Sequence, residues 1–234
     1  MIPIHDDNPT RIKPILTIAF IVTCVVVFLW QVSQGPRGQQ VIVYALGVIP
    51  AVLFDTVELP PELSWVPPSA TIFTSMFLHG GWMHLLGNML YLWVFGNNVE
   101  DAMGHIRFVM FYLLCGVAAV FAQALPAPES QIPMVGASGA ISGVLGAYVL
   151  LHPHARILVA IPLGFYLHTV RLKAVWVLGL WFGMQLISSV TASGEGGGVA
   201  FRAHIGGFIA GMALIPFFKD KRFRLFNPLA TRRR

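Results

Sequence analysis

Long apolar stretches separated by short polar segments dominate the chain. A membrane-spanning helix needs roughly 20 mostly apolar residues, and six segments meet or nearly meet this length. The predicted spans cover residues 14–32, 77–94, 108–125, 135–151, 174–190 and 203–218. The pattern therefore predicts an all-α membrane protein with six transmembrane helices in one bundle.

Two further apolar runs, residues 41–54 and 157–170, are too short to span. Each holds an internal proline, Pro50 in the first and Pro162 in the second. Runs of this length are more typical of interfacial or re-entrant segments. We therefore expect neither run to cross the membrane.

Composition supports a lipid environment. Of the 234 residues, 56% are hydrophobic and only 11% are charged, whereas a soluble domain has about 25% charged residues. The mean hydropathy is +0.72. These values exclude a soluble globular domain and a disordered chain, and they exclude a nucleic-acid-binding module despite the net charge of +5. The lipid bilayer is the expected partner of most of the surface.

The lysines and arginines predict the orientation. Six spans place both termini on one side, and of the 15 lysines and arginines only Arg37 and Arg202 then lie on the other side. The positive-inside rule puts the basic side, and with it both termini, in the cytoplasm. The second, fourth and sixth spans all enter from the external face, so their N-terminal ends share one depth.

Polar side chains stand at this depth on three predicted spans. The second span carries His84 and Asn88 four residues apart, which places them on one helical face; the fourth carries Ser138 and the sixth His204. Taken singly, such a serine usually bonds a carbonyl of its own helix, and such a histidine often bridges helices. Polar groups inside a bilayer are costly and tend to mark function, so their coincidence at one depth favours a site.

Small residues indicate how the fourth and sixth spans pack. Gly139 and Gly143 form one small-xxx-small face, and Gly207 and Gly211 form another. Such faces let helix backbones approach closely. A hydroxyl and an imidazole reach hydrogen-bond distance, roughly 2.6–3.2 Å, only if their helices do so. The same glycines would therefore serve both helix packing and chemistry.

The inventory of ligands and acids limits the chemistry. His79, His84 and His204 could converge on a metal, but no HExxH pattern, thiolate pair or nearby carboxylate completes a shell. We expect no metal and no cofactor. Since no aspartate or glutamate falls within a span at the depth of Ser138, a Ser-His-Asp triad has no third member. A Ser-His dyad is the expected arrangement.

The three polar segments resemble motifs of the rhomboid intramembrane serine proteases. GASG around Ser138 resembles the nucleophile motif GxSG, and AHIGGFIAG resembles the segment that carries the histidine base. HGGWMHLLGNM resembles the HxxxN segment of oxyanion donors. The resemblance covers residues 14–218, and a short basic tail, 219–234, follows. We expect a single rhomboid-like membrane domain over residues 1–234.

The resemblance implies roles for these residues. Ser138 would be the nucleophile and His204 the general base, while His84, Asn88 and the backbone N–H of Ser138 would stabilise the oxyanion. The implied substrates are single-span membrane proteins, cut near their outer membrane boundary, and the implied location is the bacterial plasma membrane. Some members have a tyrosine four residues after the serine, stacked on the histidine. Ser142 stands there, so the sequence does not identify what orients the His204 ring.

Two other functions are alternatives to a protease. A catalytically silent relative could bind and escort membrane-protein clients, but such relatives usually lack Ser138 or His204. A small transporter or channel would be expected to have inverted repeats or a charged mid-membrane residue, and the sequence shows neither. The glycine-rich stretch 193–198 fits a lid over the site as well as it fits a plain linker.

Overall fold

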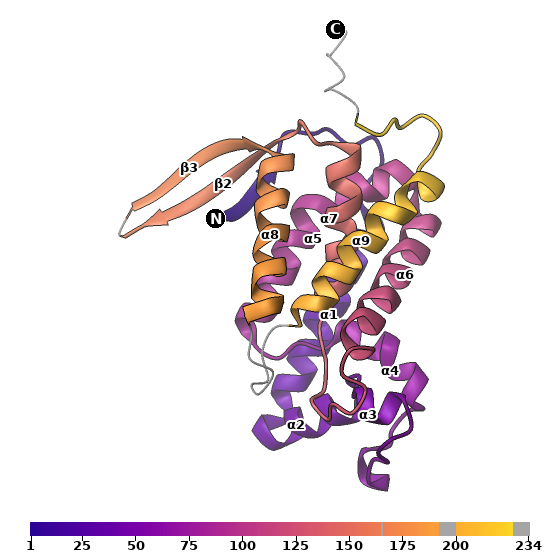
Figure 1. Cartoon of the computed structure of the whole chain (residues 1–234). Coiled ribbons are helices and arrows are strands. Elements are labelled where there is room, and N and C mark those ends of the chain that lie inside the picture. Colours follow the sequence, from indigo (N-terminus) through magenta and orange to yellow (C-terminus); the bar gives the residue numbers. More distant parts are fainter. Residues whose placement is uncertain (165, 192–199, 227–234) are drawn as a thin grey trace, which may run out of the picture.

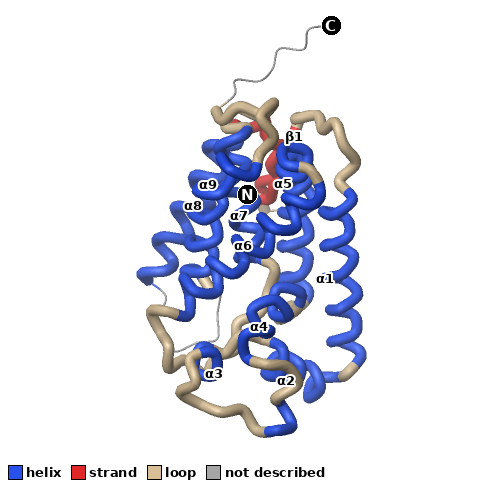
Figure 2. Tube along the Cα trace, turned by 90° about the vertical axis from the view of Figure 1, so that its right-hand side faces the viewer, coloured by secondary structure: helices blue, strands red, loops and turns tan. Residues whose placement is uncertain are grey.

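Six long helices make up the body of the protein in the computed structural model, which describes residues 1–164, 166–191 and 200–226 (Figure 1). They pack side by side into a bundle, and a small sheet lies at the end that carries the N-terminus (Figures 1 and 2). These helices are α1 (Ile15–Ser33), α5 (Trp82–Met103), α6 (His105–Ala124), α7 (Ser138–Leu151), α8 (Ala174–Thr191) and α9 (Phe201–Phe218).

Four of these helices, α1, α6, α8 and α9, are long and apolar enough to cross a membrane. The other two predicted spans differ for separate reasons. Helix α7 has only 14 residues, and α5 carries polar residues along its length, among them Asn88, Asn98 and the fully buried Glu100. The polar residues of α5 named here are buried, whereas its exposed side chains, among them Leu86 and Trp93, are apolar. The protein is thus a mostly helical, multi-pass membrane protein, and the six-span topology stays a prediction.

Helix α7 is the centre of the bundle. It packs against α9, α6 and α5, and most of its side chains are buried, with Val144, Ala147 and Tyr148 at 0% exposure. The largest apolar cluster of the protein surrounds it. The helix that carries Ser138 is therefore held from several sides.

The backbones of α7 and α9 touch. A Cβ added to Gly207 would overlap the carbonyl oxygen of Gly139, and one added to Gly211 would overlap that of Gly143. From the other side, a Cβ on Gly146 would overlap the carbonyl oxygen of Phe208. Only glycine allows this approach along the whole contact.

The glycines of α7 also face a second helix. The missing side chains of Gly139 and Gly143 point to Ala119 and Cys115 of α6. Gly139 and Gly143 therefore face α6 with their Cα atoms and contact α9 through their carbonyl oxygens. The spacing of these glycines predicted the contact with α9 but not the contact with α6.

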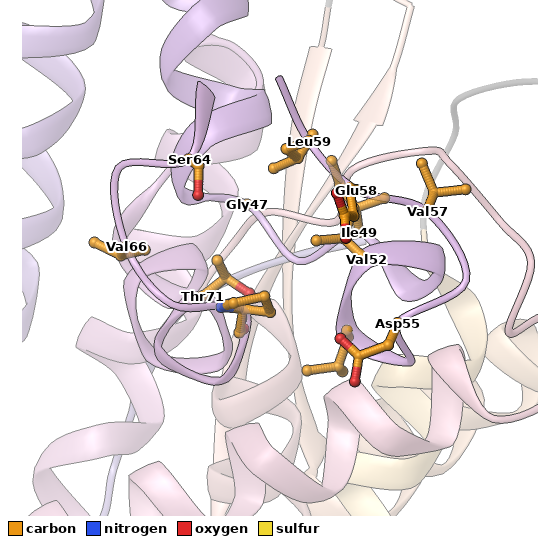
Figure 3. Close-up of a pocket in the computed structure, with 12 residues that line it drawn as sticks. Gly47, Ile49, Val52, Asp55, Val57, Glu58, Leu59, Ser64, Val66 and Thr71 are labelled. Atoms are coloured by element: carbon orange, nitrogen blue, oxygen red, sulfur yellow. The ribbon is translucent and has the colours of Figure 1, made fainter. Parts of the chain in front are cut away.

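Short helices form the end of the bundle opposite the N-terminus (Figure 2). The apolar run 41–54 makes no span, as expected. It lies in α2 (Gly35–Leu46) and α3 (Pro50–Leu53), which are followed by η1 (Pro61–Leu63), α4 (Pro68–Thr74) and η2 (Ser75–Phe77). Between α3, α4 and their connection lies a cavity of about 220 Å³, lined by residues that include Ile49, Val52, Asp55 and Thr71 (Figure 3).

The second short run forms an element that the sequence analysis did not predict. Residues 157–170 belong to an antiparallel hairpin of β2 (Arg156–Leu163) and β3 (Tyr166–Lys173), and β1 (Ile2–Asp6) pairs with β2 to complete the order β1-β2-β3. The expected all-α fold class is corrected in this respect. β-Branched residues favour strands, Pro162 disfavours a helix, and Gly164 adopts a positive φ of 60° at the turn.

A buried carboxylate fastens the first long helix. Helix α1 has no side-chain cap of its own, but Glu100 of α5 accepts hydrogen bonds from the backbone N–H of Leu16 (3.0 Å) and Thr17 (2.8 Å) and from the Thr17 hydroxyl (2.7 Å). The first N–H groups of a helix lack intrahelical acceptors, and the N-terminus favours negative charge. Glu100 therefore joins α5 to α1.

A second buried carboxylate fastens the sheet. Asp6 of β1 is 5% exposed, and its Oδ2 accepts hydrogen bonds from the Tyr148 hydroxyl and from Asn98 Nδ2, each at 2.7 Å. Burial raises the pKa of Asp6 from 3.8 to about 6, and the hydrogen bond from Tyr148 opposes this rise. Ionisation of Asp6 therefore costs more in the folded protein than in the unfolded chain.

This pKa predicts a pH-dependent stability. The folded state binds the Asp6 proton more tightly than the unfolded chain does. The stability that this proton contributes is therefore present at about pH 4 and is lost as the pH rises past about 6. A shift of about two units corresponds to roughly 3 kcal/mol. Asp6→Asn keeps a neutral acceptor for Tyr148 and Asn98. The variant should melt at a higher temperature than the wild type at pH 7.5 and at a similar temperature at pH 4.

Thermal unfolding in detergent at the two pH values checks this prediction. Asp7→Asn alters the exposed neighbour of Asp6, whose charge is a smaller cause of the raised pKa than burial, and the variant should keep most of the wild-type pH dependence. An Asp6→Asn variant that is less stable than the wild type at pH 7.5 would show that ionised Asp6 holds the strand in place.

Candidate active site

Ser138 and His204 meet at one end of the α7–α9 contact. Ser138 is the first residue of α7, and His204 lies in the first turn of α9. The distance from His204 Nε2 to Ser138 Oγ is 2.8 Å, although the two residues are 66 positions apart. His204 is only 8% exposed. The glycine contact between the two helices accounts for this distance, because it brings their first turns side by side.

The second ring nitrogen of His204 also has a partner. Its Nδ1 lies 2.8 Å from Oε1 of Gln185 on α8. An amide oxygen only accepts hydrogen bonds, so Nδ1 carries the proton of the neutral ring, and Nε2 is left to accept from the Ser138 hydroxyl. Trp181, one turn earlier on α8, lies with its ring centre 5.9 Å from that of His204.

Gln185 orients the ring of His204, a role for which the sequence alone identified no residue. Ser142, at the position of the stacking tyrosine of some relatives, donates its hydroxyl to the carbonyl oxygen of Ser138 at 2.6 Å. The group that holds the His204 ring comes instead from the neighbouring helix. A polar residue inside an apolar span is the signal that could have identified Gln185, but the spacing of the span does not show which ring it reaches.

His84 lies beside the loop that leads into Ser138. A Cβ on Gly136, whose φ is +128°, would lie 2.7 Å from both Cε1 and Nε2 of His84 and 3.6 Å from Ser138 Oγ. The backbone N–H of Gly80 donates to His84 Nδ1 at 3.3 Å. Because Nδ1 accepts, the proton of the neutral ring resides on Nε2. His84 thus presents an N–H donor near the serine.

Asn88 lies one turn further along α5. It is 8% exposed, and its Nδ2 is buried without an acceptor among the described residues. Among the described residues, both ring nitrogens of His79 and Nε2 of His152 are buried without a partner too, but of these three residues only Asn88 lines the cavity that contains Ser138. The unpaired amide is what a site held ready for a ligand oxygen would contain.

One large cavity contains all four predicted site residues. Its volume is about 1300 Å³, and Ser138, His204, His84 and Asn88 lie in its wall. Other lining residues come from α5, α6, α8 and the segment before α7. A cavity of this size accommodates an extended peptide segment as well as water.

The described residues bring no set of metal ligands together. The rings of His79 and His84 are 5.2 Å apart, edge to face. In the part of the chain that the structure describes, no group of three or more histidine, cysteine, aspartate or glutamate residues could hold a metal ion. The proposed lid, residues 193–198, lies outside the described residues.

Comparison with known proteins identifies the family of the chain. The family model described as "Rhomboid domain" matches residues 69–221, which is more than half of the chain. This matched region begins in α4 and includes α5, α6, α7, α8 and α9. All four site residues therefore fall inside it.

Curated relatives come from several kinds of organism. Over 145 residues the chain is 34% identical to Rhomboid protease GluP of Bacillus subtilis (strain 168), covering 61% of this chain and 25% of that protein. It is 33% identical to the mitochondrial Rhomboid protein 1 of Saccharomyces cerevisiae, covering 50% of this chain and 38% of that protein. It is 34% identical to Rhomboid-like protease 5 of Toxoplasma gondii, covering 58% of this chain and 15% of that protein. The chain thus spans well under half the length of each of these relatives. The family model and these relatives show that the chain belongs to the rhomboid family.

Proposed function

We propose that this protein is an intramembrane serine endopeptidase, with Ser138 as its nucleophile and His204 as its general base. The observation that carries the proposal is the 2.8 Å hydrogen bond between His204 Nε2 and Ser138 Oγ, with Gln185 on the opposite ring nitrogen. Two of the relatives above are named as proteases.

The chemistry follows from the protonation states. As Ser138 Oγ attacks the scissile carbonyl, its proton passes to His204 Nε2, which is the free acceptor of the ring. The charged ring keeps its Nδ1–H bond to Gln185. His204 then returns the proton to the leaving amine, and an acyl-enzyme remains on Ser138. Water then attacks the acyl-enzyme and gives a proton to His204, which passes it to Ser138 Oγ as the second product leaves.

Three donors surround the place where the oxyanion forms. Ser138 begins α7, so its backbone N–H has no acceptor within the helix. Asn88 supplies the unpaired Nδ2, and His84 supplies Nε2–H. Donors fixed in advance near a developing negative charge lower the barrier because they need little reorganisation.

The length of α7 supports a site below the membrane surface. Fourteen residues span about 21 Å, whereas the hydrocarbon core is about 30 Å thick. With the other end of α7 at the basic side of the bilayer, Ser138 lies within the membrane near the opposite boundary. Single-span membrane proteins cut near their outer boundary are therefore the proposed substrates. The distribution of lysine and arginine supports cytoplasmic termini. The bacterial plasma membrane is proposed as the location because the family resemblance implies it.

The first prediction for this function concerns the dyad. Ser138→Ala and His204→Ala should each abolish cleavage of a single-span substrate in proteoliposomes, and the double variant should be no worse, because residues that act as one unit are non-additive. Ser142→Ala, one turn along the same helix, is the matched control and should keep activity and labelling by a fluorophosphonate. An unlabelled, inactive wild type that still binds clients would instead indicate a silent escort protein.

The second prediction concerns the oxyanion donors. Loss of one such donor typically lowers kcat by on the order of 10²–10³. For Asn88→Ala and His84→Ala the loss of kcat should lie toward the lower end of this range, because the remaining side chain and the Ser138 N–H still donate hydrogen bonds. Substrate KM should change little, since these donors matter most when charge develops. Wild-type turnover together with a large loss of melting temperature would make the two residues structural.

The third prediction concerns Gln185 as a positioning residue. Gln185→Leu removes the acceptor for Nδ1–H, and the loss of one net hydrogen bond, about 0.5–1.5 kcal/mol, predicts a roughly 2- to 13-fold lower rate of fluorophosphonate labelling. Gln185→Glu keeps an acceptor and should label faster than the leucine variant. Nitrogen NMR of protein that carries ¹⁵N-enriched histidine should show mixed ring tautomers of His204 in Gln185→Leu only. Ser189→Ala, one turn further along α8, is the control, and equal labelling of all variants would contradict the assignment.

A further inference from the structure

The β2–β3 hairpin has no role in the proposed chemistry. It leaves the bundle between α7 and α8 and extends sideways past α8, as Figure 1 shows. Its root is packed, with Ile157 and Val159 at 0% exposure. Its far half is exposed, with Tyr166 at 82% and Leu167 at 64%. An apolar hairpin tip thus projects from a protein that lies in a membrane.

The two faces of the hairpin differ. Side chains alternate between the faces of a strand, so Ile157, Val159 and Ile161 of β2 share the face that packs on the bundle. Ile161 pairs with His168, which places His168 on this same face beyond the bundle. Thr169, the next residue of β3, lies on the opposite face and is also exposed. The bundle-side face therefore continues outward beside α8.

The helix beside this face has an exposed apolar surface. Helix α8 is long and apolar enough to cross a membrane, and its first turns expose Trp176 (70%) and Leu180 (51%) next to the hairpin root. Tyr166 and Trp176 are both exposed aromatic residues with a polar group, which is the type enriched where a bilayer meets water. The exposed surface of α8 and that of the hairpin are thus continuous.

The charge of the hairpin matches one class of lipid. Arg156, Arg171 and Lys173 are exposed near its root, and residues 156–173 contain no aspartate or glutamate. Basic groups near a membrane surface are attracted to anionic headgroups. The apolar tip and the basic root are therefore arranged as in other elements that lie in the interface.

We propose that the β2–β3 hairpin lies in the bilayer interface at the end of the bundle that carries β1. Its bundle-side face enters the leaflet beside α8, and its basic root binds anionic phospholipid headgroups. The hairpin then fixes the tilt and depth of α7 and α8, to which its two ends are joined. This inference goes beyond the proposed function and does not depend on catalysis.

Two adjacent residues provide a matched pair for the experiment. His168→Cys and Thr169→Cys, each labelled with an environment-sensitive fluorophore, report on opposite faces of β3. Cys24 and Cys115 are both at 0% exposure, so the unsubstituted chain serves as the labelling control. The protein is placed, one copy per nanodisc, in phosphatidylcholine with or without phosphatidylglycerol, and acyl-chain spin labels serve as the quencher.

The proposal predicts blue-shifted, quenched emission at position 168 and water-like emission at position 169. Phosphatidylglycerol should strengthen the quenching at 168, and Arg171→Gln with Lys173→Gln should remove this dependence. Water-like emission at both positions would overturn the proposal. Blue-shifted emission that the acyl-chain spin labels do not quench would also overturn it, because protein rather than lipid would then cover the hairpin.

Discussion

The contact between the backbones of α7 and α9 is the constraint on which the proposed site depends. Gly207 and Gly211 leave no room for a side chain against the carbonyl oxygens of Gly139 and Gly143. Ser138 and His204 stand at the open end of this contact, at a distance of 2.8 Å. In lipid, where the hydrophobic effect does not drive helices together, close packing of small residues supplies much of the association energy. Stability and the geometry of the dyad thus come from the same contact.

Buried polar groups divide into two kinds along this bundle. At the end that carries β1, two buried carboxylates are paired: Asp6 with Tyr148 and Asn98, and Glu100 with the first turn of α1. At the other end, Asn88 holds a buried donor without a partner among the described residues. Paired groups stabilise the fold, whereas an unpaired donor costs free energy until a ligand oxygen reaches it. The unpaired amide of Asn88 thus lies at the same end of the bundle as Ser138 and His204.

The hydrogen bonds at the end of the bundle that carries Ser138 set the protonation states of the His204 and His84 rings. Gln185 accepts from His204 Nδ1, which leaves Nε2 as the acceptor toward the serine. Gly80 donates to Nδ1 of His84, which leaves its Nε2–H as a donor. The two histidines thus hold opposite tautomers, one suited to take a proton and one suited to give a hydrogen bond. A dyad without a carboxylate can be oriented by an amide in this way.

Hydropathy by itself determined the membrane environment and the approximate limits of the helices, because burial in lipid requires long apolar runs. Motif spacing indicated the residues of the proposed site, because the glycine and polar positions recur at helical spacing. The tertiary structure alone decided the remaining features. Gln185 reaches His204 because α8 packs beside α9, a contact that no local pattern encodes. The run 157–170 forms a hairpin because β2 pairs with β3 across the turn at Gly164, and β1, from the distant N-terminus, adds a third strand to it. A short apolar run is compatible with strand or helix until its partners are known. Both the contact of α8 with α9 and the pairing of β1 with β2 join parts of the chain that local propensity does not relate to one another.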